Sequence, residues 1–158
     1  ELYHNKDAYW ETVVDVAKHT TLARMQRSTT IMGRTEGENL DFAKLLYPAM
    51  QVADIYFQHI TIAHAGMDQR KANVIAREVA TKLQYHKLEH KGKTFSPIAV
   101  HQHLVMGLQK PPLWPIPKEK LQEMRSALKM SKSVQGSAIF LDDSSEEIMK
   151  KMNGAFCV

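Results

Sequence analysis

The first third of the chain is predicted to be helical, because apolar side chains recur there every three or four residues. Polar stretches and capping residues divide this part into three helices, over about residues 7–19, 20–32 and 40–58. Pro48 lies inside the third of these helices, which predicts a kink or a break at Tyr47.

The pattern changes after the third helix. A short β-branched segment over 59–64, bounded by Gly66, predicts a strand. A strongly helical pattern follows over 67–85, then a basic turn over 86–94, then a second strand-like segment over 97–101. This order of strand, helix and strand is typical of a βαβ unit with a parallel sheet, so the predicted fold class is α/β.

Prolines and polar loops divide the last third of the chain. Four of the six prolines fall in the rigid, extended stretch 111–117. Beyond it the sequence predicts a short helix over 118–128, a polar loop over 129–133, a strand over 137–141 and a final helix over 144–153. Ser144 or Ser145, followed by two glutamates, is typical of a helix start.

Composition sets broad limits on the function. The chain has 158 residues, which suits about one domain, and 44% of them are hydrophobic and 24% charged. One cysteine excludes a disulfide framework and a cysteine-based zinc site, and no apolar run approaches the roughly 20 residues of a membrane span. The formal charge of +4 is compatible with a polyanionic partner, although an ordinary surface explains it as well.

Three polar residues share one face of the third predicted helix. Tyr47, Gln51 and Asp54 follow one another at spacings of four and three, and their neighbours are mostly apolar. A helix that is apolar nearly all round is usually buried, and a buried polar stripe must find partners. The stripe is therefore either a solvated face or the wall of a pocket for a small polar ligand.

The turn from the first predicted strand into the next helix is a second candidate. It reads His64-Ala65-Gly66-Met67-Asp68-Gln69, and ligands of open α/β sheets bind at the carboxyl ends of strands. Gly66 permits close backbone approach, and free N–H groups at a helix start favour anions. Asp68 and Gln69 are equally suited to capping the helix.

A third candidate is the loop Lys129-Met130-Ser131-Lys132-Ser133. Two ammonium groups three residues apart in a hydroxyl-rich loop suit a phosphate chain, and the alternative is an exposed basic loop. The pairs His101/His103 and His86/His90 look like metal ligands but lack a nearby carboxylate, so no metal site is predicted.

These motifs converge on one family. The loop 129–133 is the signature loop of class I aminoacyl-tRNA synthetases, and 47–55 resembles the tyrosine-binding helix of tyrosyl-tRNA synthetases. The segment 65–71 resembles the next motif of those enzymes in its archaeal and eukaryotic form. Two further segments that fit are 20–28 and 140–148. The resemblance covers essentially the whole chain and follows the family order.

The resemblance implies a Rossmann-like α/β fold and a role for each candidate residue. Asp54 would bind the phenolic hydroxyl of substrate tyrosine. The α-ammonium group of the substrate would be held by Tyr47, Gln51 and Gln69. Gly66 and Asp68 would contact the ribose of ATP. The loop Lys129, Met130, Ser131, Lys132 and Ser133 would bind ATP, with Lys129, Ser131 and Lys132 holding the triphosphate as it reacts.

The reaction that the resemblance implies, activation of tyrosine by ATP, needs little from the protein beyond positioning of the substrates and stabilisation of charge. The carboxylate of tyrosine is itself the nucleophile at the α-phosphorus, so no general base is required. Asp54 would be left unpaired by phenylalanine, and such a site discriminates by about 10⁴–10⁵. Mg²⁺ is expected to accompany ATP.

The resemblance also implies a domain division and partners. Residues 1–46 would be the helical connecting insertion, which makes a homodimer interface and helps receive the acceptor end of tRNA(Tyr), and 47–158 the second half of the catalytic domain. Apolar residues expected at that interface, or else packed on their own domain, are Tyr9, Trp10, Leu22, Met25, Ile31 and Met32.

Part of the family pattern is missing from the sequence. The signature of the His-Ile-Gly-His type is absent, as is an anticodon-recognition region, and the chain begins on Glu1 without a secretory signal. We therefore expect a piece of a longer cytoplasmic protein that alone binds tyrosine and ATP weakly or not at all. The alternatives are a tryptophanyl-tRNA synthetase and a non-catalytic module that binds RNA or a partner.

Overall fold

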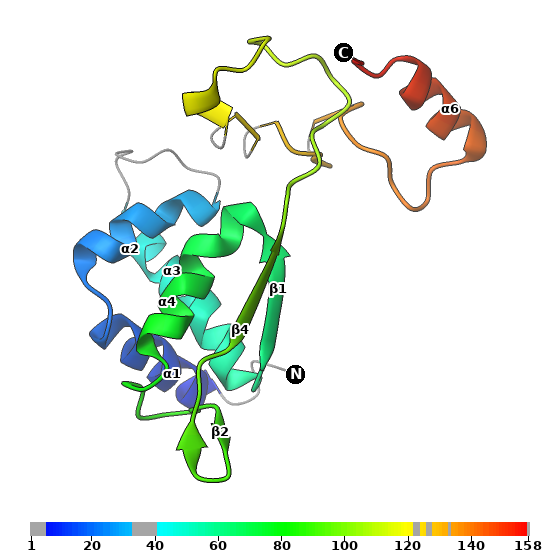
Figure 1. The fold of residues 1–158 in the computed structure, drawn as a ribbon. Coiled ribbons are helices and arrows are strands. Elements are labelled where there is room, and N and C mark those ends of the chain that lie inside the picture. The colour runs from blue at the N-terminus through cyan, green and yellow to red at the C-terminus, as the bar shows by residue number, and fades with distance from the viewer. Residues whose placement is uncertain (1–5, 33–40, 122–123, 126–127, 133, 158) are drawn as a thin grey trace. The chain divides into compact units, whose positions relative to one another are not determined.

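The computed structural model in Figure 1 describes residues 6–32, 41–121, 124–125, 128–132 and 134–157. It consists of two compact units, Glu1–Gln102 and His103–Val158.

Two helices open the first unit. Helix α1 covers Lys6–Lys18 and α2 covers Leu22–Ser28, followed by the 3₁₀ turn η1 at Thr29–Met32. Thr21 caps α2, since its hydroxyl accepts a hydrogen bond from the Arg24 amide, as the sequence predicts. The helix tightens into η1 where consecutive Ser and Thr hydroxyls donate to carbonyls of the preceding turn.

Helix α3 runs without interruption from Phe42 to Phe57, so the predicted break at Tyr47 is wrong. Asp41 caps its start by accepting a hydrogen bond from the Lys44 amide at 3.0 Å. Pro48 removes one helical hydrogen bond, but it is fully buried among apolar neighbours. Packing of this buried face stabilises the helix more than the missing hydrogen bond weakens it.

The core of the first unit lies between α1, α3 and α4 (Arg70–Val79) (Figure 1). Its fully buried side chains include Val13, Val16, Val52, Tyr56 and Ile75. Burial of such a side chain contributes roughly 1.5–3 kcal/mol. The Tyr56 hydroxyl donates to the Ala76 carbonyl, which joins α3 to α4 inside this core.

The predicted βαβ unit is confirmed. Strands β1 (Ile62–Gly66) and β4 (Ile98–Gln102) pair in parallel, from Ile62 opposite Ile98 to Gly66 opposite Gln102. The 3₁₀ turn η2 (Met67–Gln69) and α4 follow β1 along the chain. Strand β1 starts later than predicted because His59, with φ of 53°, makes a tight turn after α3.

Two local predictions in this unit are wrong. The predicted helix over 67–85 ends at Val79. Beyond it the Asp15 carboxylate accepts the amides of Gln84 and Tyr85, at 2.6 and 3.2 Å, so a tertiary contact competes with the helix. The predicted basic turn 86–94 holds a small hairpin instead.

The hairpin pairs β2 (Glu89–His90) with β3 (Lys93–Thr94) in antiparallel order. Its two turn residues, Lys91 and Gly92, have φ of 50° and 71°. Positive φ at both positions gives the turn the twist that suits a two-residue hairpin.

The described part of the second unit has little regular structure. Its described elements are the 3₁₀ turn η3 (Lys118–Lys120) and helix α6 (Ser145–Asn153). The predicted start of α6 is confirmed as a capping box, in which Ser144 and Glu147 exchange hydrogen bonds. The predicted strand over 137–141 is wrong: its first carbonyl accepts the Leu108 amide, and Leu141 is fully exposed.

The predicted helix over 118–128 is described only in part. It starts as η3, and Leu121, Met124 and Arg125 are helical, while 122–123 and 126–127 lie outside the described residues. The proline-rich stretch 111–117 forms no helix or strand. Among the described helices of both units, none combines the length and the apolar character that crossing a membrane requires.

Candidate functional site

The predicted polar stripe lies on one face of α3. Because the helix is continuous, Tyr47, Gln51 and Asp54 keep the spacing that aligns them. Tyr47 is 44% exposed, while Gln51 and Asp54 are half-buried. The stripe therefore runs from an exposed residue, Tyr47, to two half-buried residues, and it is not a fully solvated face.

Gln51 and Gln69 contact each other, although 18 residues separate them along the chain. The side-chain amide of Gln69 donates to the Ile31 carbonyl at 3.1 Å, and its oxygen accepts from the Gln51 amide at 2.9 Å. The Gln51 Oε1 atom is then buried without a hydrogen-bond partner in the described structure. A buried acceptor without a partner costs about 1–3 kcal/mol, so it suits a ligand that donates.

Asp54 is held from the first helix. The Tyr9 hydroxyl donates to Asp54 Oδ1 at 3.0 Å, and Tyr9 itself is buried. Burial raises the pKa of the Asp54 carboxyl, and the hydrogen bond from Tyr9 opposes that rise. Sequence reasoning did not single out Tyr9 as a site residue, because nothing in the spacing of α1 connects it with a carboxylate 45 residues away.

The turn after β1 carries the next predicted residues. Gly66 ends β1 opposite Gln102 of β4, and Asp68 and Gln69 follow in η2 at that carboxyl end of the sheet. The alternative in which Gln69 caps α4 is not what the side chain does, since it bonds to Gln51 and Ile31 instead. The structure thus brings Gln69 to the polar face of α3.

The lysine loop belongs to the second unit, and Ser133 lies outside the described residues. The backbone of the loop is fixed at several points. Lys129 forms an isolated antiparallel β-bridge with Met106, and the Met130 amide donates to the Val105 carbonyl at 3.2 Å. The buried Ser137 hydroxyl donates to the Ser131 carbonyl and accepts from its amide. Lys132 is exposed, so its ammonium group is presented from an anchored backbone.

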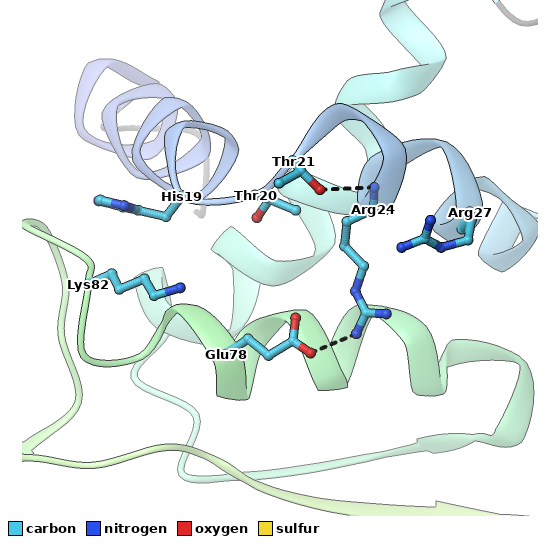
Figure 2. Close-up of a pocket in the computed structure, with 7 residues that line it drawn as sticks. All are labelled: His19, Thr20, Thr21, Arg24, Arg27, Glu78 and Lys82. Atoms are coloured by element: carbon cyan, nitrogen blue, oxygen red, sulfur yellow. Dashed lines mark hydrogen bonds and ion pairs between the residues drawn. The ribbon is translucent and has the colours of Figure 1, made fainter.

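A further pocket in the first unit was missed by the sequence analysis (Figure 2). It has a volume of about 320 Å³ and is lined by His19, Thr20, Thr21, Arg24, Arg27, Glu78 and Lys82. Arg24 pairs with Glu78 at 2.8 Å, and the basic side chains outnumber this carboxylate. The basic residues come from α2, from the chain before it and from the chain just after α4, so no local motif in the sequence predicts the pocket.

The histidines form no metal cluster in the part of the chain that the structure describes, where no three His, Cys, Asp or Glu side chains gather. His101 instead contacts the Asn73 side chain at 3.1 Å. Burial lowers the pKa of His101, and the nearby Arg70 and His64 lower it further.

A parallel βαβ unit with polar residues at the carboxyl end of its first strand is typical of proteins of the α/β class. The sequence matches the family described as tRNA synthetases class I (W and Y) over residues 2–158, and the chain belongs to this family. The match to this family and to its solved structures confirms the predicted α/β fold class with a Rossmann-like parallel sheet.

Similar proteins of high sequence identity are named as tyrosine–tRNA ligases or tyrosyl-tRNA synthetases. The tyrosine–tRNA ligase of Thermococcus gammatolerans is 61% identical over 153 residues, 96% of this chain and 41% of the relative. The crystal structure of tyrosyl-tRNA synthetase complexed with L-tyrosine from Pyrococcus horikoshii matches with a TM-score of 0.86 and 59% identity, over 95% of this chain and 41% of that one.

A tyrosyl-tRNA synthetase structure from Aeropyrum pernix matches with a TM-score of 0.72 and 37% identity, over 99% of this chain and 38% of that one. The chain therefore spans about two fifths of the length of these relatives.

Proposed function

We propose that the protein carrying this chain is a tyrosine–tRNA ligase, which activates tyrosine with ATP and transfers it to tRNA(Tyr). The observation that carries the proposal is the arrangement of Gln51, Asp54 and Gln69. It combines an amide oxygen without a partner and a half-buried carboxylate on the same helix face. An ammonium group suits the amide oxygen of Gln51 and a phenolic hydroxyl suits the carboxylate of Asp54. Tyrosine has both groups.

Within this proposal the predicted residues keep their roles. Asp54 accepts the phenolic hydroxyl, and the α-ammonium group is held by Tyr47, Gln51 and Gln69. Gly66 and Asp68 lie at the carboxyl end of β1, where the ribose of ATP would bind. Relatives about 60% identical that are named for tyrosine support this choice over the tryptophan enzyme.

The lysine loop serves the chemical step. A carboxylate oxygen of tyrosine forms a bond to the α-phosphorus, and the bond from that phosphorus to pyrophosphate breaks with its electron pair. Lys129 and Lys132 stabilise the negative charge of the departing pyrophosphate, and the backbone and hydroxyl of Ser131 position it. Met130 and Ser133 complete the proposed ATP-binding loop.

An amino-acid panel tests this function. The full-length protein that carries the chain is incubated with ATP, labelled pyrophosphate and tyrosine, tryptophan or phenylalanine in turn. We expect exchange with tyrosine alone. Exchange with tryptophan alone would favour the tryptophan enzyme, and no exchange at all would favour a non-catalytic module.

The loop has its own test in the same assay. Lys132→Ala should lower the rate by about 100-fold or more, with a small change in the KM for tyrosine. The matched control is Lys120→Ala, an exposed lysine of the same unit outside the loop, which should leave the rate near that of the wild type. Equal rates for both variants would exclude the role proposed for Lys132.

The acceptor end of tRNA(Tyr) is proposed to contact the helical segment 1–46. The basic pocket of Figure 2 supports this, since Arg24 and Arg27 gather there with Lys82 and suit phosphate groups. Arg27→Ala should weaken tRNA binding. It should also reduce the slope of the logarithm of the binding constant against the logarithm of salt concentration by about one. Lys93→Ala, an exposed lysine outside the segment and the pocket, is the control, and activation of tyrosine without tRNA should stay unchanged in both variants.

We propose the same segment as a homodimer interface, and 47–158 as the second half of the catalytic domain. Of the apolar residues expected there, Tyr9, Met25 and Ile31 are buried in the core of their own unit. Trp10 and Leu22 are exposed, and Val14 and Phe42 are exposed with them. Val14→Glu should turn a dimer into a monomer in light scattering, whereas Val134→Glu, outside the segment, should not.

Mg²⁺ is proposed to enter with ATP and to neutralise its phosphates. The described residues offer no cluster of carboxylate and histidine ligands for it, so no step is assigned to a protein-held metal. We propose a cytoplasmic location, since the single cysteine and the proposed use of tRNA both fit that compartment.

A further inference from the structure

The contact between Tyr9 and Asp54 joins two helices at the proposed amino-acid site. Tyr9 Oη lies 3.0 Å from Asp54 Oδ1 and 3.4 Å from the Met50 carbonyl oxygen. A phenol has one proton, which goes to the nearer and charged acceptor. The hydrogen bond is therefore directed at the carboxylate.

The ring of Tyr9 is fixed on two sides. It makes edge contacts with Trp10 and Phe57, with ring centroids 6.1 and 5.5 Å apart, and the side chain is only 3% exposed. A donor locked in this way holds its acceptor in one rotamer. The remaining oxygen of Asp54 and the second lone pair of Oδ1 keep capacity for another donor.

We propose that Tyr9 is a positioning residue of the amino-acid site: its hydroxyl fixes the Asp54 carboxylate so that it accepts the phenolic hydroxyl of the substrate. This inference rests on the function proposed above. It assigns to the first helix of the segment 1–46 a part in the choice of amino acid, in addition to its packing.

The same hydrogen bond favours the charged form of the carboxylate. Burial raises the pKa of Asp54 and Tyr9 opposes the rise, so loss of the hydroxyl would raise that pKa further. Tyr9 is the titratable side chain whose contact with Asp54 the structure describes. An ionised carboxylate accepts a phenol better than a neutral one, so the hydroxyl serves recognition twice, through orientation and through charge.

Tyr9→Phe in the full-length protein is the test, because it removes one oxygen and keeps the ring contacts. We expect the KM for tyrosine to rise about tenfold while kcat stays within about twofold. The acid limb of kcat/KM for tyrosine should move to higher pH by about half a unit to one unit. Selectivity for tyrosine over phenylalanine should fall by about the same factor as the KM rises.

Tyr56→Phe is the matched control. It also removes a buried phenolic hydroxyl, but one that donates to the Ala76 carbonyl and not to Asp54. It should lower thermal stability and leave the KM for tyrosine and the pH profile unchanged. If the role of Tyr9 were purely structural, Tyr9→Phe would also lose stability and keep the KM for tyrosine and the pH profile of the wild type. That result would overturn the proposal.

The outcomes also separate this inference from the proposed function. If the wild type activates tyrosine and Asp54→Ala abolishes it, an unchanged KM and pH profile in Tyr9→Phe overturns the positioning role alone. If the wild type activates no tyrosine, the proposed function fails and the inference fails with it. A nuclear magnetic resonance titration of the Asp54 carboxyl gives a readout besides activity: its pKa should be higher in Tyr9→Phe than in the wild type.

Discussion

Gly107 packs against the backbone that anchors the lysine loop, and an alanine there tests how that loop is held. A Cβ atom on Gly107 would lie 3.2 Å from the carbonyl oxygens of Leu128 and Ser137. These oxygens accept hydrogen bonds from the amides of Gly107 and Leu108, at 2.7 and 3.0 Å. Gly107→Ala must therefore shift both carbonyls by a few tenths of an ångström.

The magnitude follows from those contacts. Each backbone hydrogen bond contributes about 0.5–1.5 kcal/mol, and overpacking of a tight contact costs about 1–3 kcal/mol. We expect the loop region to lose about 1–3 kcal/mol of local stability. Amide hydrogen exchange in peptides that include Leu108, Met130 and Ser137 should accelerate by roughly ten- to a hundredfold. The KM for ATP should rise with it, because the loop presents Lys132.

The control is Gly154→Ala at the end of α6, where the added Cβ would make an ordinary contact of 3.5 Å with the Lys150 carbonyl. It should leave exchange in the loop region unchanged. Loop exchange in Gly107→Ala that equals the wild type would refute the view that Gly107 is required by this close approach.

Two further predictions concern stability. Asp15→Ala removes the buried acceptor of the Gln84 and Tyr85 amides, so the free energy of unfolding in denaturant should fall by about 2–4 kcal/mol, whereas Glu11→Ala, exposed on the same helix, should change it by less than about 0.5 kcal/mol. Hydrogen bonds from Ser144 hold the pKa of Glu147 below its usual range, so their stabilisation of α6 is present above the ordinary glutamate pKa and is lost as pH falls through the lowered one. Protection of the α6 amides, taken relative to the intrinsic exchange rate at each pH, should fall several-fold on acidification in the wild type, while Glu147→Gln should show weaker protection at neutral pH and respond little to acid; equal changes in protection would contradict this reasoning.

Local patterns account for most of the predicted fold. The starts of α2, α3 and α6 are marked by Thr21, Asp41 and Ser144, whose side chains accept amides of their own helices. The parallel pairing of β1 and β4 follows from the strand–helix–strand order. These features depend on residues close together in the sequence, which is why spacing alone predicts them.

What the sequence could not predict depends on contacts between distant residues. The early end of α4 reflects the Asp15 carboxylate, which lies 69 residues before the Gln84 amide. The contact of Tyr9 with Asp54 and that of Gln69 with the Ile31 carbonyl span 45 and 38 residues. The polar stripe on α3 was predicted, but its hydrogen bonds with Tyr9 of α1 and Gln69 of η2 were not, because no local spacing encodes them.

We propose that the polar face of α3 recognises the amino acid, and Asp54→Ala in the full-length protein tests this role most directly. The measurement is tyrosine-dependent exchange of pyrophosphate into ATP, compared with the wild type at equal enzyme concentration. Loss of the half-buried acceptor should lower kcat/KM for tyrosine by at least about 100-fold, since a site of this kind discriminates by about 10⁴–10⁵. An exchange rate and a KM for tyrosine equal to those of the wild type would contradict the account.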